Sequence, residues 1–105
     1  MPDSDTPARI TVVIPTLNEA RAIEETVRLL RREVDEVIVV DGGSRDETAA
    51  SARNAGARVR VAVGSTRAVA LNTGAAIATG EIVYFVHADC RPPPGFRENE
   101  PVPLP

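Results

Sequence analysis

The chain has 105 residues, enough for one domain, and 43% of them are hydrophobic while only 3% are aromatic, so a core would be built from aliphatic side chains. Twelve basic residues stand against 15 acidic ones, and the net charge of −3 gives no reason to expect nucleic acid or an anionic membrane as a partner. The single cysteine, Cys90, excludes an internal disulfide. No apolar run approaches the roughly 18–20 residues of a transmembrane helix, and the acidic N-terminus does not resemble a signal peptide. These features predict a cytoplasmic protein without a transmembrane segment.

Four short apolar runs alternate with three amphipathic stretches along the chain. The apolar runs predict strands at residues 10–14, 37–40, 58–63 and 82–86. Helices are expected between them, at about residues 18–32, 44–56 and 66–78. In the first of these, Ile23, Val27 and Leu30 recur at helical spacing, and Asn18 is a candidate cap. The second begins with a possible capping box from Ser44 to Glu47 and ends near Gly56.

This alternation predicts an α/β fold in which a parallel sheet has helices on both faces, a three-layer α/β/α architecture. We expect the strand order 3-2-1-4, with the topological switch point between the first and fourth strands. Residues 1–9 are expected to be a disordered lead-in and residues 10–91 the domain. The proline-rich segment 92–105 is expected to be extended or disordered, because proline breaks helices and central strands.

Two predicted strands end at a carboxylate. Asp41 follows the second strand directly, and Asp89 lies three residues beyond the fourth. Ligands of open α/β sheets bind beyond the carboxyl ends of the strands, so both acids should lie at the binding edge. Two acids at one edge suit a nucleotide and its metal ion. Gly74, in the middle of the third predicted helix, indicates close packing or clearance for a ligand.

Four motifs in a fixed order resemble glycosyltransferase family 2, whose members are inverting enzymes with the GT-A fold that use nucleotide-diphosphate sugars. They are Pro15-Thr16-Leu17-Asn18-Glu19, Asp41-Gly42-Gly43-Ser44 with the residues to Thr48, Asn72-Thr73-Gly74 with Gly80-Glu81, and His87-Ala88-Asp89. The resemblance spans about residues 10–96 and is nearest to bacterial members with Asp-Gly-Gly-Ser and His-Ala-Asp motifs. It implies a Rossmann-like nucleotide-binding half of a GT-A fold.

The resemblance also implies a set of site residues. Contacts to the nucleotide-sugar donor are expected from Pro15, Asn18, Glu19, Asp41, Gly42, Gly43, Asp46, Arg67, Asn72 and Ala88. Asp89 and His87 stand at the position that binds Mn²⁺ or Mg²⁺ in the family, although His87 replaces the usual aspartate and could instead contact the ribose or a phosphate. Structural roles remain open for several of them: Asn18 as a helix cap, Arg67 as a solvated surface residue and His87 as a strand-end histidine.

No residue is assigned as catalytic, because the family's general base lies downstream, in the half that binds the acceptor. We therefore expect the donor half of a hexosyltransferase, which binds a nucleotide diphosphate weakly and transfers no sugar alone. Its partner would be a missing C-terminal acceptor half or another chain. The alternative is a non-catalytic nucleotide-binding module that acts with a partner chain. A nucleotidyltransferase is a weaker third hypothesis, because the loop after the first strand is not the glycine-rich, lysine-containing loop of that class.

Overall fold

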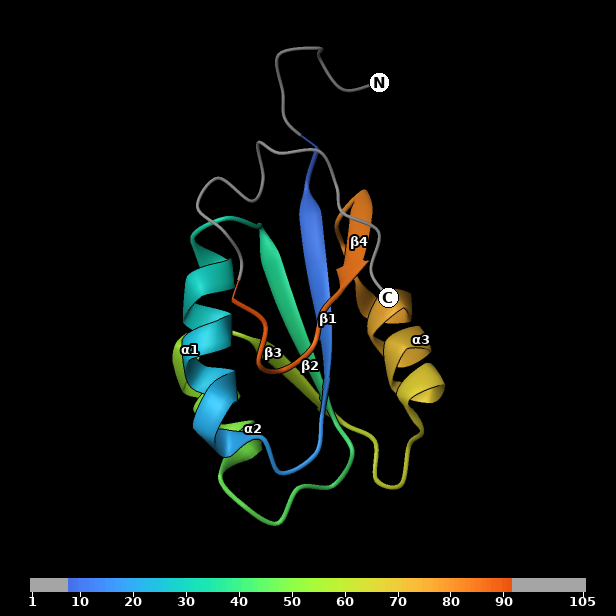
Figure 1. Cartoon of the computed structure of the whole chain (residues 1–105). Coiled ribbons are helices and arrows are strands. Elements are labelled where there is room, and N and C mark those ends of the chain that lie inside the picture. The colour runs from blue at the N-terminus through green and yellow to red at the C-terminus, as the bar shows by residue number, and fades with distance from the viewer. Residues whose placement is uncertain (1–7, 92–105) are drawn as a thin grey trace.

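The computed structural model describes residues 8–91 and shows four parallel strands alternating with three helices (Figure 1). The strand order is β3-β2-β1-β4, which confirms the predicted topology. The predictions for residues 1–7 and for the proline-rich segment lie outside the described residues. In chain order the elements are β1 (Ile10–Thr16), α1 (Ala20–Arg31), β2 (Glu36–Asp41), α2 (Thr48–Ala55), β3 (Arg58–Val61), α3 (Arg67–Ile77) and β4 (Ile82–Phe85).

The helices divide between the two faces of the sheet. Helices α1 and α2 lie together on one face, and α3 covers the other (Figure 1). The predicted inner face of α1 is confirmed, because Ile23, Val27 and Leu30 are fully buried. Each such side chain contributes about 1.5–3 kcal/mol when removed from water. A second, smaller cluster lies between the sheet and α3, where Ala70 contacts the inward-facing residues of β1 and β2. The three layers expected from the sequence are therefore present.

The glycine in α3 is explained by its closeness to the sheet. A Cβ atom placed on Gly74 would lie 2.3 Å from a methyl carbon of Val13, which no side chain can occupy without a shift. Close packing, one of the two explanations expected from the sequence, thus accounts for this residue. The contact lets α3 approach the middle of β1 closely.

Strand β1 runs two residues further than predicted and includes Pro15. The last pair between β1 and β4 joins Val13 to Phe85, and the Val13 carbonyl accepts a bond from the N–H of Val86. The backbone N–H and C=O groups of alternate residues point to the same neighbouring strand, so those of Pro15 point to the β4 side, as those of Val13 do. At Pro15, however, β4 has already ended. The missing N–H of Pro15 therefore breaks no ladder bond. Strand β3 is shorter than predicted and ends at Val61.

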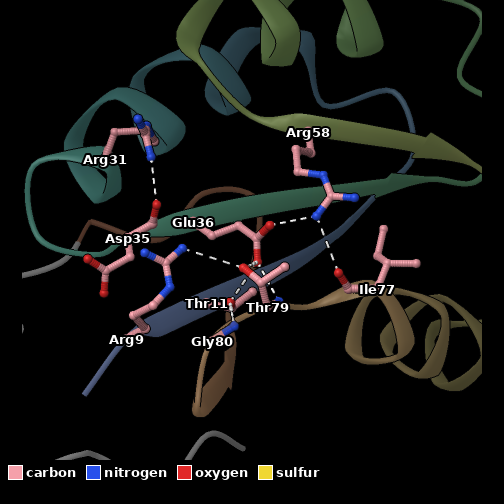
Figure 2. A network of polar contacts seen from close by, with 9 residues as sticks. All are labelled: Arg9, Thr11, Arg31, Asp35, Glu36, Arg58, Ile77, Thr79 and Gly80. Atoms are coloured by element: carbon pink, nitrogen blue, oxygen red, sulfur yellow. Dashed lines mark hydrogen bonds and ion pairs between the residues drawn. The ribbon is translucent and has the colours of Figure 1, made fainter. Parts of the chain in front are cut away.

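The amino ends of the strands are joined by a network of polar contacts around Glu36 (Figure 2). Its Oε1 atom accepts hydrogen bonds from the hydroxyl of Thr11 at 2.8 Å and from the N–H of Thr79 at 2.9 Å. Its Oε2 atom lies 2.6 Å from Nη1 of Arg58. One buried carboxylate thus connects β1, β2, β3 and the segment that leaves α3.

Candidate functional site

A cleft of about 550 Å³ opens at the carboxyl edge of the sheet, within the size range of small-ligand sites. Its walls come from the ends of β1 and β2, from the loops that follow β1, β2 and β3, from the first turn of α3, and from the residue after Val86. In Figure 1 these loops lie together at the lower end of the sheet. The lining residues are Pro15, Thr16, Leu17, Glu19, Val40, Gly42, Gly64, Ser65, Thr66, Arg67, Ala70 and His87.

Asp41, at the end of β2, organises the loop beside this cleft. Its side chain is almost completely buried, and Oδ1 accepts bonds from the hydroxyls of Thr16 at 2.8 Å and Ser44 at 2.5 Å. The Oδ2 atom accepts the N–H groups of Gly43 at 3.1 Å and Ser44 at 2.7 Å. Desolvation alone would raise the pKa of Asp41, but these hydrogen bonds outweigh it and hold the pKa below its ordinary value. The charged carboxylate therefore fixes the Gly42-Gly43 turn.

The loops after β1 and β2 are bound to each other by side-chain hydrogen bonds. The Asn18 N–H donates to the Ser44 hydroxyl at 2.7 Å, and Asn18 Oδ1 accepts the N–H of Arg45 at 2.9 Å. In the same way, the N–H of Glu19 donates to the Thr48 hydroxyl at 2.8 Å. These contacts join two segments that are about 26 residues apart in the sequence.

Two predicted helix caps are consequently wrong. Asn18 does not cap α1: it has a φ of 54°, and the N-cap is Glu19, without a side-chain bond. The predicted capping box also fails, because α2 begins later than Ser44, at Thr48, with Glu47 as an uncapped N-cap. In both cases the polar side chain bonds the neighbouring loop instead of its own helix. The left-handed Gly56 at the end of α2 is as expected.

Arg67 and His87 meet at one end of the cleft. Nη2 of Arg67 lies 3.4 Å from Nε2 of His87, and both side chains are exposed. Because a guanidinium only donates, Nε2 would be the acceptor in a hydrogen bond between them. The contact brings the start of α3 to the exit of β4, and it gives this end of the cleft a fixed positive charge.

The segment after β4 is held against α1 by a buried threonine. In Figure 1 this segment leaves β4 and crosses the sheet towards α1. The Thr26 hydroxyl lies 2.6 Å from the carbonyl oxygen of Ala88 and 3.2 Å from that of Cys90, and Nη1 of Arg91 donates to the same hydroxyl at 2.5 Å. Thr26 therefore holds the backbone on both sides of Asp89, whose side chain is exposed.

The structure distributes the predicted site residues among three environments. Those that line the cleft are Pro15, Glu19, Gly42, Arg67 and His87. Those that build or join the loops around it are Asn18, Asp41, Gly43 and Asp46, whose Oδ1 accepts the N–H of Thr48 at 3.0 Å. Asn72 is exposed on α3, Ala88 packs in the core, and Asp89 is exposed beyond β4, at the same edge as Asp41. For all of them, contact with a ligand stays a prediction.

Within residues 8–91, no group of three or more His, Cys, Asp or Glu side chains could hold a metal ion. Asp89 and His87 are therefore two possible ligands at most. A divalent ion that bridges a diphosphate takes most of its ligands from phosphate oxygens and water, so this donor set fits such an ion.

The cleft also contains residues that the sequence analysis missed. The largest group is Gly64, Ser65 and Thr66, from the loop that follows β3. A signal was present, because this loop leaves the carboxyl end of a parallel strand, and a serine or threonine before a helix is a common cap. Thr66 does cap α3, with its hydroxyl accepting the N–H of Val69 at 3.2 Å.

Comparison with curated proteins finds relatives among glycosyltransferases. The chain is 38% identical over 92 residues to the glucosyl-3-phosphoglycerate synthase of Mycobacterium tuberculosis, a match that covers 76% of this chain and 28% of that protein. It is 40% identical over 67 residues to glycosyltransferase AglJ of Haloferax volcanii, covering 63% and 22% of the two chains. The chain thus spans less than a third of the length of these relatives. In the part of the chain that the structure describes, no helix is long and apolar enough to cross a membrane.

Solved structures agree with these relatives. The M. tuberculosis synthase in complex with Mn²⁺, uridine diphosphate and glucosyl-3-phosphoglycerate matches with a TM-score of 0.68 and 34% identity, over 77% of this chain and 33% of that one. The mannosyl-3-phosphoglycerate synthase of Rubrobacter xylanophilus has a TM-score of 0.72 at 22% identity, over 78% and 31%, and supports the fold alone. The family model of glycosyl transferase family 2 matches residues 11–99. The chain therefore belongs to glycosyltransferase family 2, with the GT-A fold.

Proposed function

We propose that this chain forms the donor-binding part of a glycosyltransferase, and that its cleft holds a nucleoside diphosphate sugar with a divalent metal ion. The observation that carries the proposal is the cleft itself. It lies at the carboxyl edge of a parallel sheet, in a member of a family whose mycobacterial relative is solved with uridine diphosphate and Mn²⁺. The same relative has also been solved with Mg²⁺ and uridine diphosphate.

The diphosphate belongs at the β4 side of the cleft. Arg67 supplies a permanent positive charge and several N–H donors there, which suits phosphate oxygens. Asp89 supplies a hard oxygen ligand for Mg²⁺ or Mn²⁺, and the bound ion would neutralise charge on the departing nucleoside diphosphate. Because Nε2 of His87 faces the Arg67 guanidinium, a cation there would be repelled. We therefore assign His87 to the phosphates, together with Arg67, and the metal to Asp89.

The nucleobase belongs at the other end, between the loops after β1 and β2 and the inner face of α3. Pro15, Leu17, Val40 and Ala70 line the cleft there with apolar surface, which suits the faces of a flat base. The turn fixed by Asp41 presents backbone groups of Gly42 to the same space. In this arrangement Asp41 acts on the ligand through the loop it holds.

The proposal is tested by calorimetric titration of the purified chain with uridine, cytidine, adenosine and guanosine diphosphates, each with and without Mn²⁺. We expect binding of at least one of them, strengthened by the metal. Asp89→Asn should remove the metal dependence. The control is Glu81→Gln, which neutralises an exposed carboxylate just before the opposite end of β4. If no nucleoside diphosphate binds, or if both variants behave alike, the proposal is wrong.

A further inference from the structure

The wall of the cleft contains a buried polar atom with no partner. Among the described residues, Ser65 Oγ is the one buried side-chain nitrogen or oxygen without a hydrogen bond. Buried hydroxyls nearly always have a partner, because an unpaired one keeps the penalty of leaving water. The described residues offer this hydroxyl no partner, so a ligand is the natural place to look for one.

The position of Ser65 shows which part of the ligand it would meet. It lies between Gly64 and the α3 cap Thr66, and its N–H donates to the Ala62 carbonyl at 3.0 Å, which fixes its backbone. Across from it, a Cβ atom placed on Gly42 would lie 3.8 Å from Ser65 Oγ. Ser65 therefore stands where the loops after β2 and β3 meet, and in the strand order β4 lies beyond β1 from these two strands.

We propose that the Ser65 hydroxyl hydrogen-bonds the polar edge of the nucleobase and contributes to the choice of base. This inference rests on the proposed function, which puts the phosphates beside Arg67 and His87. A serine hydroxyl both donates and accepts, and it moves between staggered rotamers, so Oγ can turn into the cleft that Ser65 already lines. A site with a buried hydrogen-bonding group rejects ligands that leave the group unpaired. The hydroxyl is therefore suited to selecting one base edge from others.

The decisive variant is Ser65→Ala, compared with Ser51→Ala, which removes a partly buried serine hydroxyl from α2, away from the cleft. Binding of the four nucleoside diphosphates and of inorganic pyrophosphate is measured by calorimetry with Mn²⁺, and thermal unfolding is measured without ligand. We expect Ser65→Ala to weaken the preferred nucleoside diphosphate about tenfold and to reduce the preference among bases. Pyrophosphate affinity and metal dependence should stay unchanged. The melting temperature should not fall, because the variant removes an unpaired buried atom.

Three results would overturn the inference. Unchanged affinity and base preference in Ser65→Ala would show that the hydroxyl has no role in binding. An equal loss for pyrophosphate would move the contact to the phosphates. A lower melting temperature with unchanged base preference would make the residue structural. All three leave the proposed function standing if the wild-type chain binds a nucleoside diphosphate and Asp89→Asn removes the metal effect. Absence of any binding by the wild type would overturn both.

Discussion

Strand β2 has a buried carboxylate at each end, and the two ends are built differently. At the amino end, Glu36 receives hydrogen bonds from elements far apart in the sequence and a charge partner in Arg58 (Figure 2). At the carboxyl end, three of the four hydrogen bonds of Asp41 come from its own loop, and the described structure gives it no cationic partner in contact. The carboxylate at the amino end thus joins several strands to one another. The carboxylate at the carboxyl end fixes a turn beside the cleft. This division suits a fold that needs stability at one edge and a ligand at the other.

Replacing the carboxylate by an amide should cost more stability at Glu36 than at Asp41. Glu36→Gln keeps the Oε1 acceptor but sets an N–H₂ group against the Arg58 guanidinium, so two donors meet where the Glu36 side chain is buried and that of Arg58 is half exposed. We expect a loss of about 3 kcal/mol in unfolding free energy, measured by urea denaturation. The control is Glu24→Gln, which breaks an equally short but exposed pair with Arg28 and should lose at most about 0.5 kcal/mol.

A second substitution tests whether the opposed donors cause this loss of stability. Replacing Arg58 with methionine in the Glu36→Gln background removes the opposed donor, so the double variant should recover part of the lost stability. A Glu36→Gln loss no larger than that of the Glu24 control would mean that the buried network contributes little.

As the pH falls, the protein should first lose stability through protonation of Glu36, at the amino end of β2. Desolvation would raise the pKa of Glu36, but hydrogen bonds from Thr79, Arg58 and Thr11 together lower it to about 2, from an ordinary value of 4.5. Because the folded pKa is the lower one, the stabilisation is complete above pH 4.5 and is lost as the pH falls towards 2, on the order of 2–3 kcal/mol. Urea titrations at a series of pH values should show this slope in the wild type. Glu36→Gln should flatten it and leave the contribution of Asp41 and Asp46, whose pKa values are also lowered, and an unchanged slope would contradict the assignment.

At the carboxyl end, the same kind of substitution should be tolerated better. Asp41→Asn can turn its oxygen to the N–H groups of Gly43 and Ser44, and its N–H₂ to hydroxyls that are able to accept. We expect a loss of about 1 kcal/mol in unfolding free energy by urea denaturation, with nucleotide binding retained. Asp41→Ala, which leaves every donor without an acceptor, should lose more stability and weaken nucleotide affinity. If the amide were as damaging as alanine, the charge of Asp41 itself would be required.

The smallest effect is expected from Thr26, which holds the segment around Asp89. Thr26→Val keeps the shape of the side chain but removes the hydroxyl that contacts the carbonyls of Ala88 and Cys90. We expect a loss of about 0.5–1 kcal/mol in unfolding free energy, together with a weaker Mn²⁺ dependence of nucleotide binding. Thr26→Ser retains the hydroxyl and should preserve the metal effect. An unchanged metal dependence in Thr26→Val would mean that Asp89 is positioned by other contacts.

Much of the fold was predictable because it depends on patterns within short segments. The spacing of Ile23, Val27 and Leu30 gave the buried face of α1, and the apolar runs gave the four strands. The order 3-2-1-4 was chosen among the orders that right-handed crossovers allow, and the structure confirms it. Gly74 was expected to serve either close packing or clearance for a ligand, and the methyl groups of Val13 beside it support close packing. These features need only local periodicity and residue size.

The sequence by itself therefore determined the alternation of strands and helices, the resemblance to the family, and the edge at which Asp41 and Asp89 lie, whereas the structure confirmed the strand order. Only the tertiary structure decided how the polar side chains at that edge are used. Asn18 and Ser44 have the local signature of helix caps, yet each bonds the other's loop, because the parallel strands bring those loops into contact. Likewise, only the folded structure shows that the Ser65 hydroxyl is buried without a hydrogen-bond partner. A hydrogen-bond partner is chosen by distance in space, and sequence spacing reveals it only within a single turn of a helix or loop.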